Sequence, residues 1–207
     1  MKIKPKGVNH MAELQDAEKE LYELTKKVAL LRRDAKPVPI KNYTFQGLDG
    51  EVTLGELFGD KNVLFLIHNM GQGCRYCTLW ADGLNGLIPH LEDQYALALV
   101  SKDNPQTQRA FANSRHWRFK MVSHAGGDYI TEQTVMEGEN NMPGIVCYMR
   151  KGGEIFRKNS SIFGPGDEYC PQWSILSLAG VTTEDWTPQF DYWKRPEKMD
   201  DGGKNLI

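Results

Sequence analysis

Two cysteines separated by two residues stand between a predicted strand and a predicted helix. Residues 63–67 (VLFLI) form a continuous apolar run, the pattern of a central strand buried on both faces. Cys74-Arg75-Tyr76-Cys77 follows, and residues 79–91 have the pattern of a helix. Gly71 and Gly73 allow the chain to turn between the two elements. This order of strand, turn, cysteine pair and helix constrains the fold more than the cysteine spacing alone does.

The remaining pattern predicts an α/β protein with a mixed sheet flanked by helices. An Asp-Gly turn at residues 49–50 indicates a hairpin, as does Lys-Gly-Gly at 151–153. Strands are predicted at 43–45, 52–54, 96–100, 145–149 and 155–156, with alternating Trp117, Phe119 and Met121 as a half-buried strand, and helical segments at 55–58, 105–115 and 169–179.

An amphipathic helix is predicted over residues 9–33, before this pattern begins. Asn9 can cap its start, and Pro37 prevents its continuation. We expect the helix either to pack on its own domain or to act as a dimerisation arm that forms a homodimer. Its narrow apolar stripe consists of Leu14, Ala17, Leu21, Leu24, Val28 and Leu31. The predicted organisation is an N-terminal helical arm at 1–36, a domain at 37–195 and a polar tail at 196–207.

The composition excludes several classes of protein. A net charge of -2 gives no reason to expect nucleic acid or an anionic membrane as partner. No stretch approaches the ~20 apolar residues of a membrane span, and no apolar run follows the basic first residues. We therefore expect a cytoplasmic protein, in which thiols are normally reduced. Four cysteines in such a chain are more often catalytic or metal-binding than paired in structural disulfides.

The position of the cysteine pair predicts redox chemistry. Unpaired N–H groups at a helix N-terminus stabilise an anion, so Cys74 should have a lowered pKa and act as the nucleophile. Cys77, about one turn further, can resolve a mixed disulfide. Arg75 adds positive charge, and Arg75 and Tyr76 are expected beside the substrate groove. His68, at the end of the preceding strand, is either a proton carrier for the dithiol or a hydrogen-bonded core histidine.

Other candidate sites have less support. Zinc held by all four cysteines would need two closely spaced pairs, whereas Cys147 and Cys170 stand apart, and Cys147 is expected to act as a small apolar side chain. Trp80, Asp82 and Asn85 either line a groove or serve packing and local hydrogen bonding. No phosphate-binding glycine loop and no dinucleotide fingerprint occur, so we expect no cofactor, and the spacing of the cysteines leads us to expect no metal.

The sequence resembles a known family at many of these positions. Residues 43–54 and 57–58 look like the opening of peroxiredoxin-type members of the thioredoxin-like superfamily. A closer resemblance is to a bacterial thioredoxin-like family of unassigned function, the domain-of-unknown-function 899 family. It implies a thioredoxin-like fold and no proven reaction. The matching positions are 73–74, 77, 80–86, 89–91, 100–101, Trp117, Ser123, 125–126, Asp128, 185–186 and 192–193.

The resemblance also draws attention to Met142-Pro143, just before the strand at 145–149. Thioredoxin-like folds carry a cis-proline at this place, facing the cysteine pair. We therefore expect a cis Met142–Pro143 bond that borders the substrate groove. The alternative is an ordinary trans proline that begins an edge strand.

The prediction is a thiol–disulfide oxidoreductase that acts on a protein or small-molecule disulfide. Ordinary thioredoxins have Gly-Pro where this chain has Arg75-Tyr76, and no aromatic residue directly precedes Cys74. A non-catalytic binding or structural protein is therefore the main alternative. A thiol peroxidase built on Cys77 has less support, because Cys74 occupies the place of the threonine that peroxiredoxins use to orient peroxide.

Overall fold

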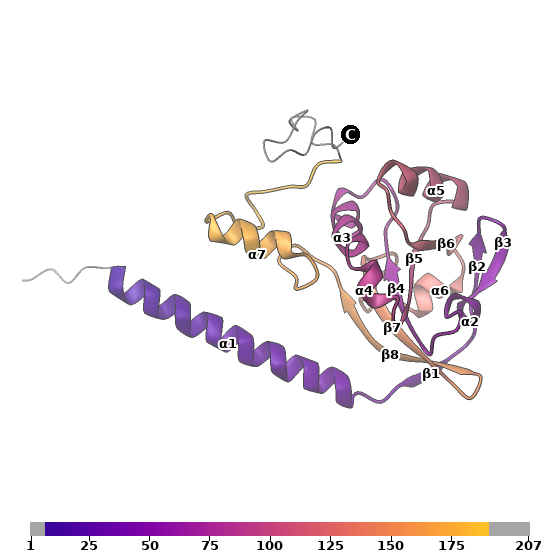
Figure 1. Cartoon of the computed structure of the whole chain (residues 1–207), viewed down its shortest axis with the longest axis horizontal. Coiled ribbons are helices and arrows are strands. Elements are labelled where there is room, and N and C mark those ends of the chain that lie inside the picture. The colour runs from indigo at the N-terminus through magenta and orange to yellow at the C-terminus, as the bar shows by residue number, and fades with distance from the viewer. Residues whose placement is uncertain (1–6, 191–207) are drawn as a thin grey trace, which may run out of the picture. The chain divides into compact units, whose positions relative to one another are not determined.

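The computed structural model describes residues 7–190, and the chain divides between Val38 and Pro39 into two compact units. The first unit contains helix α1 (Gly7–Asp34) (Figure 1). It confirms the predicted amphipathic helix, but it begins before Asn9, which is therefore not its cap. None of the helices in residues 7–190 is long and apolar enough to cross a membrane. The expected polar tail at 196–207 and the family-matching positions 192–193 lie outside the described residues.

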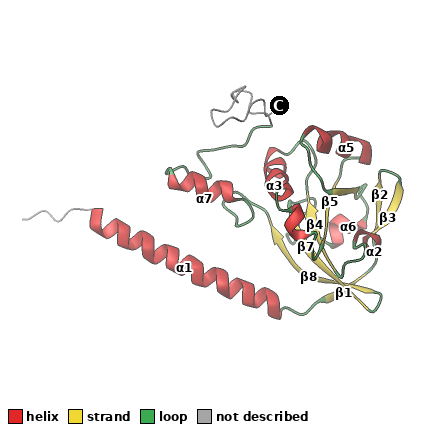
Figure 2. Ribbon diagram, in the orientation of Figure 1, coloured by secondary structure: helices red, strands yellow, loops and turns green. Residues whose placement is uncertain are grey.

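The second unit is built on one eight-stranded mixed sheet (Figure 2). Its order is β1-β8-β7-β4-β5-β6-β2-β3, with parallel pairing of β4 with β5 and of β5 with β6, and antiparallel pairing of β7 with both β4 and β8. The predicted central strand β4 indeed lies in the middle. The strands are β1 (Val38–Ile40), β2 (Thr44–Gly47), β3 (Gly50–Thr53), β4 (Val63–His68), β5 (Ala96–Ser101), β6 (Lys120–Ser123), β7 (Gly144–Lys151) and β8 (Glu154–Ile162).

Six helices accompany these strands within residues 39–190, and the last of them follows β8. The helix predicted at 79–91 instead begins at Arg75 and breaks at Gly86, so that α3 and α4 replace it. Trp117 and Phe119 are buried, but both precede the strand that they were expected to join. The helices are α2 (Leu54–Leu57), α3 (Arg75–Asn85), α4 (Ile88–Leu91), α5 (Pro105–Ser114), α6 (Asp128–Glu132), which the sequence analysis missed, and α7 (Pro171–Leu178).

The sheet separates two apolar cores. Alternate residues of β4 point to opposite faces, so Leu64 and Leu66 join one core and Ile67 joins the other. The first core includes side chains of α2 and α6, and the second includes side chains of α3, α5 and α7. The arrangement confirms the predicted α/β architecture. It also places the start of α3 at the end of β4, where the cysteines are.

The Met142–Pro143 bond is trans, since no peptide bond within residues 7–190 is cis; the expected cis bond is wrong. Asn141 makes the change of direction before it, in a left-handed conformation with φ 56°. The carbonyl of Pro143 then accepts a hydrogen bond from the N–H of Phe163 at 2.9 Å and continues the ladder between β7 and β8. Because β7 lies between β4 and β8, Pro143 does not precede an edge strand either.

Candidate active site

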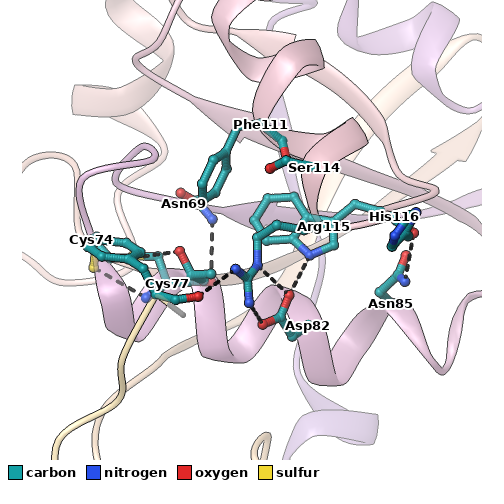
Figure 3. A network of polar contacts seen from close by, with 12 residues as sticks. Asn69, Cys74, Cys77, Asp82, Asn85, Phe111, Ser114, Arg115 and His116 are labelled. Atoms are coloured by element: carbon teal, nitrogen blue, oxygen red, sulfur yellow. Dashed lines mark hydrogen bonds and ion pairs between the residues drawn. The ribbon is translucent and has the colours of Figure 1, made fainter. Parts of the chain in front are cut away.

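Cys74 is the N-cap residue of α3 (Figure 3). Its backbone is extended, with φ -99° and ψ 107°, and its Sγ accepts a hydrogen bond from the N–H of Cys77 at 3.2 Å. Its N–H donates to the carbonyl of Gly71 at 3.0 Å, and its carbonyl accepts from the hydroxyl of Thr78 at 3.0 Å. A sulfur in the position of a capping oxygen faces the unpaired donors of the first helical turn.

Cys77 lies beneath this sulfur and is 3% exposed, whereas Cys74 is half-buried. The N–H of Met70 points at Sγ of Cys77 at 3.4 Å. The side-chain amide of Asn69 lies 3.5 Å from the carbonyl of Cys77, and its oxygen accepts from the N–H of Gly71 at 2.8 Å. The loop that leaves β4 therefore holds both the helix start and the buried thiol.

The two thiols have opposite pKa shifts. A hydrogen bond from the thiol of Cys77 is the main cause that lowers the pKa of Cys74 to about 6, and the backbone N–H groups of Cys77 and Tyr76 add to it against the opposing effect of burial. The pKa of Cys77 is raised far above its ordinary value, first by that same bond and then by burial. At neutral pH the geometry thus favours a Cys74 thiolate beside a protonated Cys77.

Asp103, in the loop after β5, fixes the turn before Cys74, and the sequence analysis did not identify it. Its carboxylate accepts a hydrogen bond from the N–H of Gln72 at 2.7 Å. A Cβ at residue 71 would lie 2.9 Å from both carboxylate oxygens, and φ there is 108°, so the site requires glycine. The buried amide of Gln108 holds the same loop through the carbonyl of Asp103 at 2.9 Å.

The two residues between the cysteines have different surroundings. Arg75 is exposed, and it is not among the groups that lower the pKa of Cys74. Tyr76 stacks on Trp173 of α7, with ring centroids 6.3 Å apart and planes at 28°, and also contacts Trp80 at 6.2 Å. Trp186 packs against Trp173 at 5.8 Å. These rings join α7 to the start of α3, next to the dithiol.

His68 begins a buried chain of hydrogen bonds that ends at the protein surface. Nε2 of His68 lies 2.6 Å from the hydroxyl of Tyr129, which lies 3.0 Å from the hydroxyl of Tyr148. The chain continues through the side chain of Gln133, at 3.3 Å, to the hydroxyl of Tyr43, at 3.0 Å. It ends at the carboxylate of Glu132, one oxygen of which accepts from the hydroxyl of Tyr43 at 2.8 Å. The other oxygen of Glu132 pairs with Lys41.

The direction of these bonds assigns the tautomer of His68. The carboxylate of Glu132 only accepts, so Tyr43 donates to it and accepts from the amide nitrogen of Gln133. The oxygen of Gln133 then accepts from Tyr148, which accepts from Tyr129, so that Nε2–H of His68 is the first donor. Nδ1 of His68 is consequently an acceptor, buried and without a partner among the described residues.

His68 is neutral as well as buried. Burial, with smaller contributions from the positive charge of Arg157 and from His124, lowers its pKa to about 3. The hydrogen bond that the structure gives it goes to Tyr129 and not to a cysteine. The ring of His68 therefore has the burial and the hydrogen bond expected of a core histidine. A role of His68 as a proton carrier stays a prediction.

Met142 and Pro143 lie at the same edge of the sheet as the cysteine loop. Gly144 pairs with His68 in the antiparallel register of β7 with β4, so the residues before Gly144 continue past the end of β4. Met142 is half-buried, and Pro143 is buried. Their place in a substrate groove stays a prediction.

Asp82 and Asn85 of α3 hold the loop between α5 and β6 (Figure 3). The carboxylate of Asp82 pairs with the guanidinium of Arg115 and accepts from the indole N–H of Trp117 at 2.7 Å. Asn85 bonds the carbonyl of His116 at 3.2 Å and the N–H of Arg118 at 2.8 Å. Both side chains therefore make local hydrogen bonds, which is one of the two roles expected from the sequence; the other was to line a groove.

The other two cysteines do not extend the site into a metal centre. Cys147 is half-buried in β7, and Cys170 is the buried N-cap residue of α7. Burial raises the pKa of both thiols. Within residues 7–190 no group of three or more His, Cys, Asp or Glu side chains is placed so that it could hold a metal ion.

The sheet, its helices and the cysteine pair at the start of α3 make a thioredoxin-like fold, and a solved structure shares this fold. A PrxQ mutant from Xylella fastidiosa matches with a TM-score of 0.51 at 13% identity, covering 70% of this chain and 96% of its own. Reduced Prx3 from Vibrio vulnificus matches with a TM-score of 0.49 at 15% identity, covering 70% and 98%. The likeness concerns the fold alone.

The chain belongs to the family described as "Bacterial protein of unknown function (DUF899)", whose model matches residues 8–198. This confirms the resemblance found in the sequence. A comparison with curated proteins found no match.

Proposed function

We propose that the protein is a thiol–disulfide oxidoreductase that uses Cys74 and Cys77. The hydrogen bond from the N–H of Cys77 to Sγ of Cys74 carries the proposal. It places a half-exposed sulfur at a helix start, where its thiolate is stabilised, and a buried thiol one turn away. The lowered pKa of Cys74 and the raised pKa of Cys77 fit a nucleophile beside a protonated resolving thiol.

The reaction has two exchange steps. The thiolate of Cys74 attacks one sulfur of the substrate disulfide, a mixed disulfide forms, and the other substrate sulfur leaves as a thiolate. Cys77 loses its proton and attacks Sγ of Cys74, which releases the second substrate sulfur. The substrate gains two electrons, and the protein is left with a Cys74–Cys77 disulfide. An external dithiol returns the pair to the reduced state by the reverse exchange.

The proton of Cys77 is the chemical obstacle in the second step, because its pKa is raised. The thiolate that leaves in the first step is our candidate for the group that receives it, because the lowered pKa of His68 makes that side chain a weak base and leaves at most a relay role to the His68 ring. Its Nδ1 is a buried acceptor without a partner among the described residues, and its Nε2–H is fixed by Tyr129. We also propose that the substrate is bordered by two pairs of residues, Arg75 and Tyr76 from α3 and Met142 and Pro143 from the segment before β7.

The test is a disulfide reductase assay with a dithiol as reductant and the substitutions Cys74→Ser, Cys77→Ser and Cys147→Ser. Cys74→Ser should abolish turnover, and Cys77→Ser should accumulate a mixed disulfide on Cys74 that mass spectrometry detects. Cys147→Ser, in β7, is the matched control and should keep the activity of the unaltered protein. Full activity of both Cys74→Ser and Cys77→Ser would refute the proposal and favour a binding or structural protein.

The same variants test the peroxidase alternative. A peroxidase built on Cys77 needs the Cys77 thiolate, which burial and the neighbouring sulfur disfavour. Rapid consumption of peroxide that survives Cys74→Ser and disappears in Cys77→Ser would replace the proposed assignment by this one.

A further inference from the structure

The apolar side chains of α1 form a stripe whose spacing alternates between three and four residues. This is the spacing of a coiled-coil seam, which packs against another helix rather than against a sheet. Four leucines carry most of its area, and they are 48%, 65%, 56% and 62% exposed. We call these residues the α1 stripe: Leu14, Ala17, Leu21, Leu24, Val28 and Leu31.

We propose that the α1 stripe binds the same stripe of a second copy of this chain, with the two helices antiparallel. The proposal concerns α1 alone and does not rest on the proposed redox function.

The sizes of the stripe side chains favour the antiparallel arrangement. If the helices ran parallel, Ala17 would face Ala17 of the partner subunit and leave a gap in the seam. In an antiparallel pair centred between Leu21 and Leu24, Leu21 faces Leu24 of the partner subunit. Ala17 then meets Val28 of the partner subunit, and Leu14 meets Leu31 of the partner subunit, so every layer contains at least one branched side chain.

The charges beside the stripe point the same way. They are acidic in the first half of α1, at Glu13, Glu18 and Glu20, and basic in the second half, at Lys27 and Arg32. Parallel helices would set Glu13 against Glu18 of the partner subunit and Lys27 against Arg32 of the partner subunit, two repulsive contacts that each occur twice.

Antiparallel helices instead place Glu20 beside Lys27 of the partner subunit, an attractive contact that also occurs twice. One kind of like-charged contact remains, between Glu13 and Asp34 of the partner subunit, and it also occurs twice, once at each end of the pair. The neighbouring Arg33 already pairs with Asp34 at 2.8 Å and compensates its charge. The charge pattern therefore favours the antiparallel pair. These charges determine the direction of the two helices more than they add to the affinity.

The length of the stripe sets the expected strength. From Leu14 to Leu31 it spans roughly 26 Å, since a helix rises about 1.5 Å per residue. A seam of about two and a half heptads supports a reversible dimer, so we expect dissociation in the micromolar range, on the order of 1–100 µM.

The experiment is sedimentation velocity on the reduced full-length protein over a concentration series that spans this range. Leu21→Glu should weaken dimerisation at least about tenfold, because it buries a charge at the centre of the seam. Leu30→Glu and Tyr22→Glu are the controls: both side chains are on α1, are 50% and 64% exposed, and lie outside the stripe. They should change the dissociation constant less than about threefold. A monomer at every concentration, or equal effects of Leu21→Glu and Leu30→Glu, would overturn the proposal.

A charge reversal decides the direction of the helices. Lys27→Glu should weaken the antiparallel dimer, because it sets two carboxylates beside each other, and adding Glu20→Lys should restore the affinity. In a parallel dimer Lys27→Glu would remove the repulsion from Arg32 of the partner subunit and strengthen binding. A stronger dimer with Lys27→Glu would therefore overturn the antiparallel arrangement.

Discussion

The N–H of Cys77 donates a hydrogen bond to Sγ of Cys74 at 3.2 Å, and the buried thiol of Cys77 lies against the same sulfur. One residue thus provides both a backbone and a side-chain donor to the nucleophile. The second thiol remains protonated for the same reason. The lowered pKa of Cys74 has its causes in this local geometry at the start of α3, and the charge of Arg75 is not among them.

The rate at which an alkylating reagent modifies Cys74 should follow its thiolate. We expect a half-maximal rate near pH 6, because the pKa of Cys74 is lowered to about 6. Cys77→Ala removes the main cause of the lowering and should shift the midpoint upward. Mass spectrometry of samples quenched at increasing pH gives the site and the rate. A midpoint near 8.5, the ordinary value for cysteine, would contradict the assigned geometry.

Buried His68 should make the protein sensitive to mild acid. Its pKa is about 3 in the folded state and about 6.5 in the unfolded chain, so only the unfolded chain takes up a proton between these values. The stabilisation is complete above about pH 6.5 and is lost as the pH falls towards about 3. Between pH 7 and pH 5 this loss amounts to roughly 2 kcal/mol.

Urea unfolding of the unaltered protein and of His68→Gln at pH 7 and pH 5 measures this loss. The variant should be less stable at pH 7 but lose about 2 kcal/mol less on acidification. His90→Gln, at an exposed position of α4, controls for the removal of a histidine as such. An equal loss in the unaltered protein and in His68→Gln would rule out the neutral buried ring.

Loss of the Asp82 carboxylate should destabilise the fold without altering the cysteines. Asp82→Ala leaves the indole N–H of buried Trp117 without its acceptor and removes the ion pair between Asp82 and Arg115. The expected cost is about 1–3 kcal/mol in the free energy of unfolding. Asp60→Ala is the matched control, since its ion pair with Lys61 is 3.7 Å long and its side chain is 86% exposed. Equal stabilities of the two variants would contradict the role given to Asp82.

Two glycines should respond to alanine in opposite ways. A Cβ at Gly144 would collide with the carbonyl of Ser161 and come within 2.9 Å of Val135, so Gly144→Ala should destabilise by more than about 2 kcal/mol. Gly83, inside α3, has open space around it, and Gly83→Ala should stabilise by up to about 1 kcal/mol. Thermal unfolding of both variants measures the difference, and a tolerated Gly144→Ala would show that β8 is not held so close to β7.

The sequence predicted the elements whose pattern is local and strong. The apolar run of β4, the Asp-Gly turn between β2 and β3 and the stripe of α1 each depend on neighbouring residues, and all three elements are present. The position of Cys74 at a helix start followed from the same local order. These features fixed the fold class and the candidate nucleophile.

Contacts between segments that are far apart in the chain could not be predicted from the sequence. Asp103 lies 31 residues from the Gln72 amide that it binds, and no spacing rule connects them. The hydrogen-bond chain from His68 collects side chains from three further segments: α6 with its C-cap, β7 and residues 41–43. Of these, α6 is too short to leave a helical pattern in the sequence. The prediction of a cis Met142–Pro143 bond was wrong, because it was taken from the resemblance to thioredoxin-like folds. In this chain Asn141 makes the turn instead.

The reduction potential of the Cys74–Cys77 pair is the most direct test of the proposed chemistry. The protein is equilibrated with glutathione buffers, the thiols are quenched by alkylation, and the oxidised fraction of the pair is measured by mass spectrometry. We predict a reversible two-electron couple between about -270 and -120 mV, the range of working oxidoreductases. A pair that never forms a disulfide, or one that cellular thiols cannot reduce, would contradict the proposal.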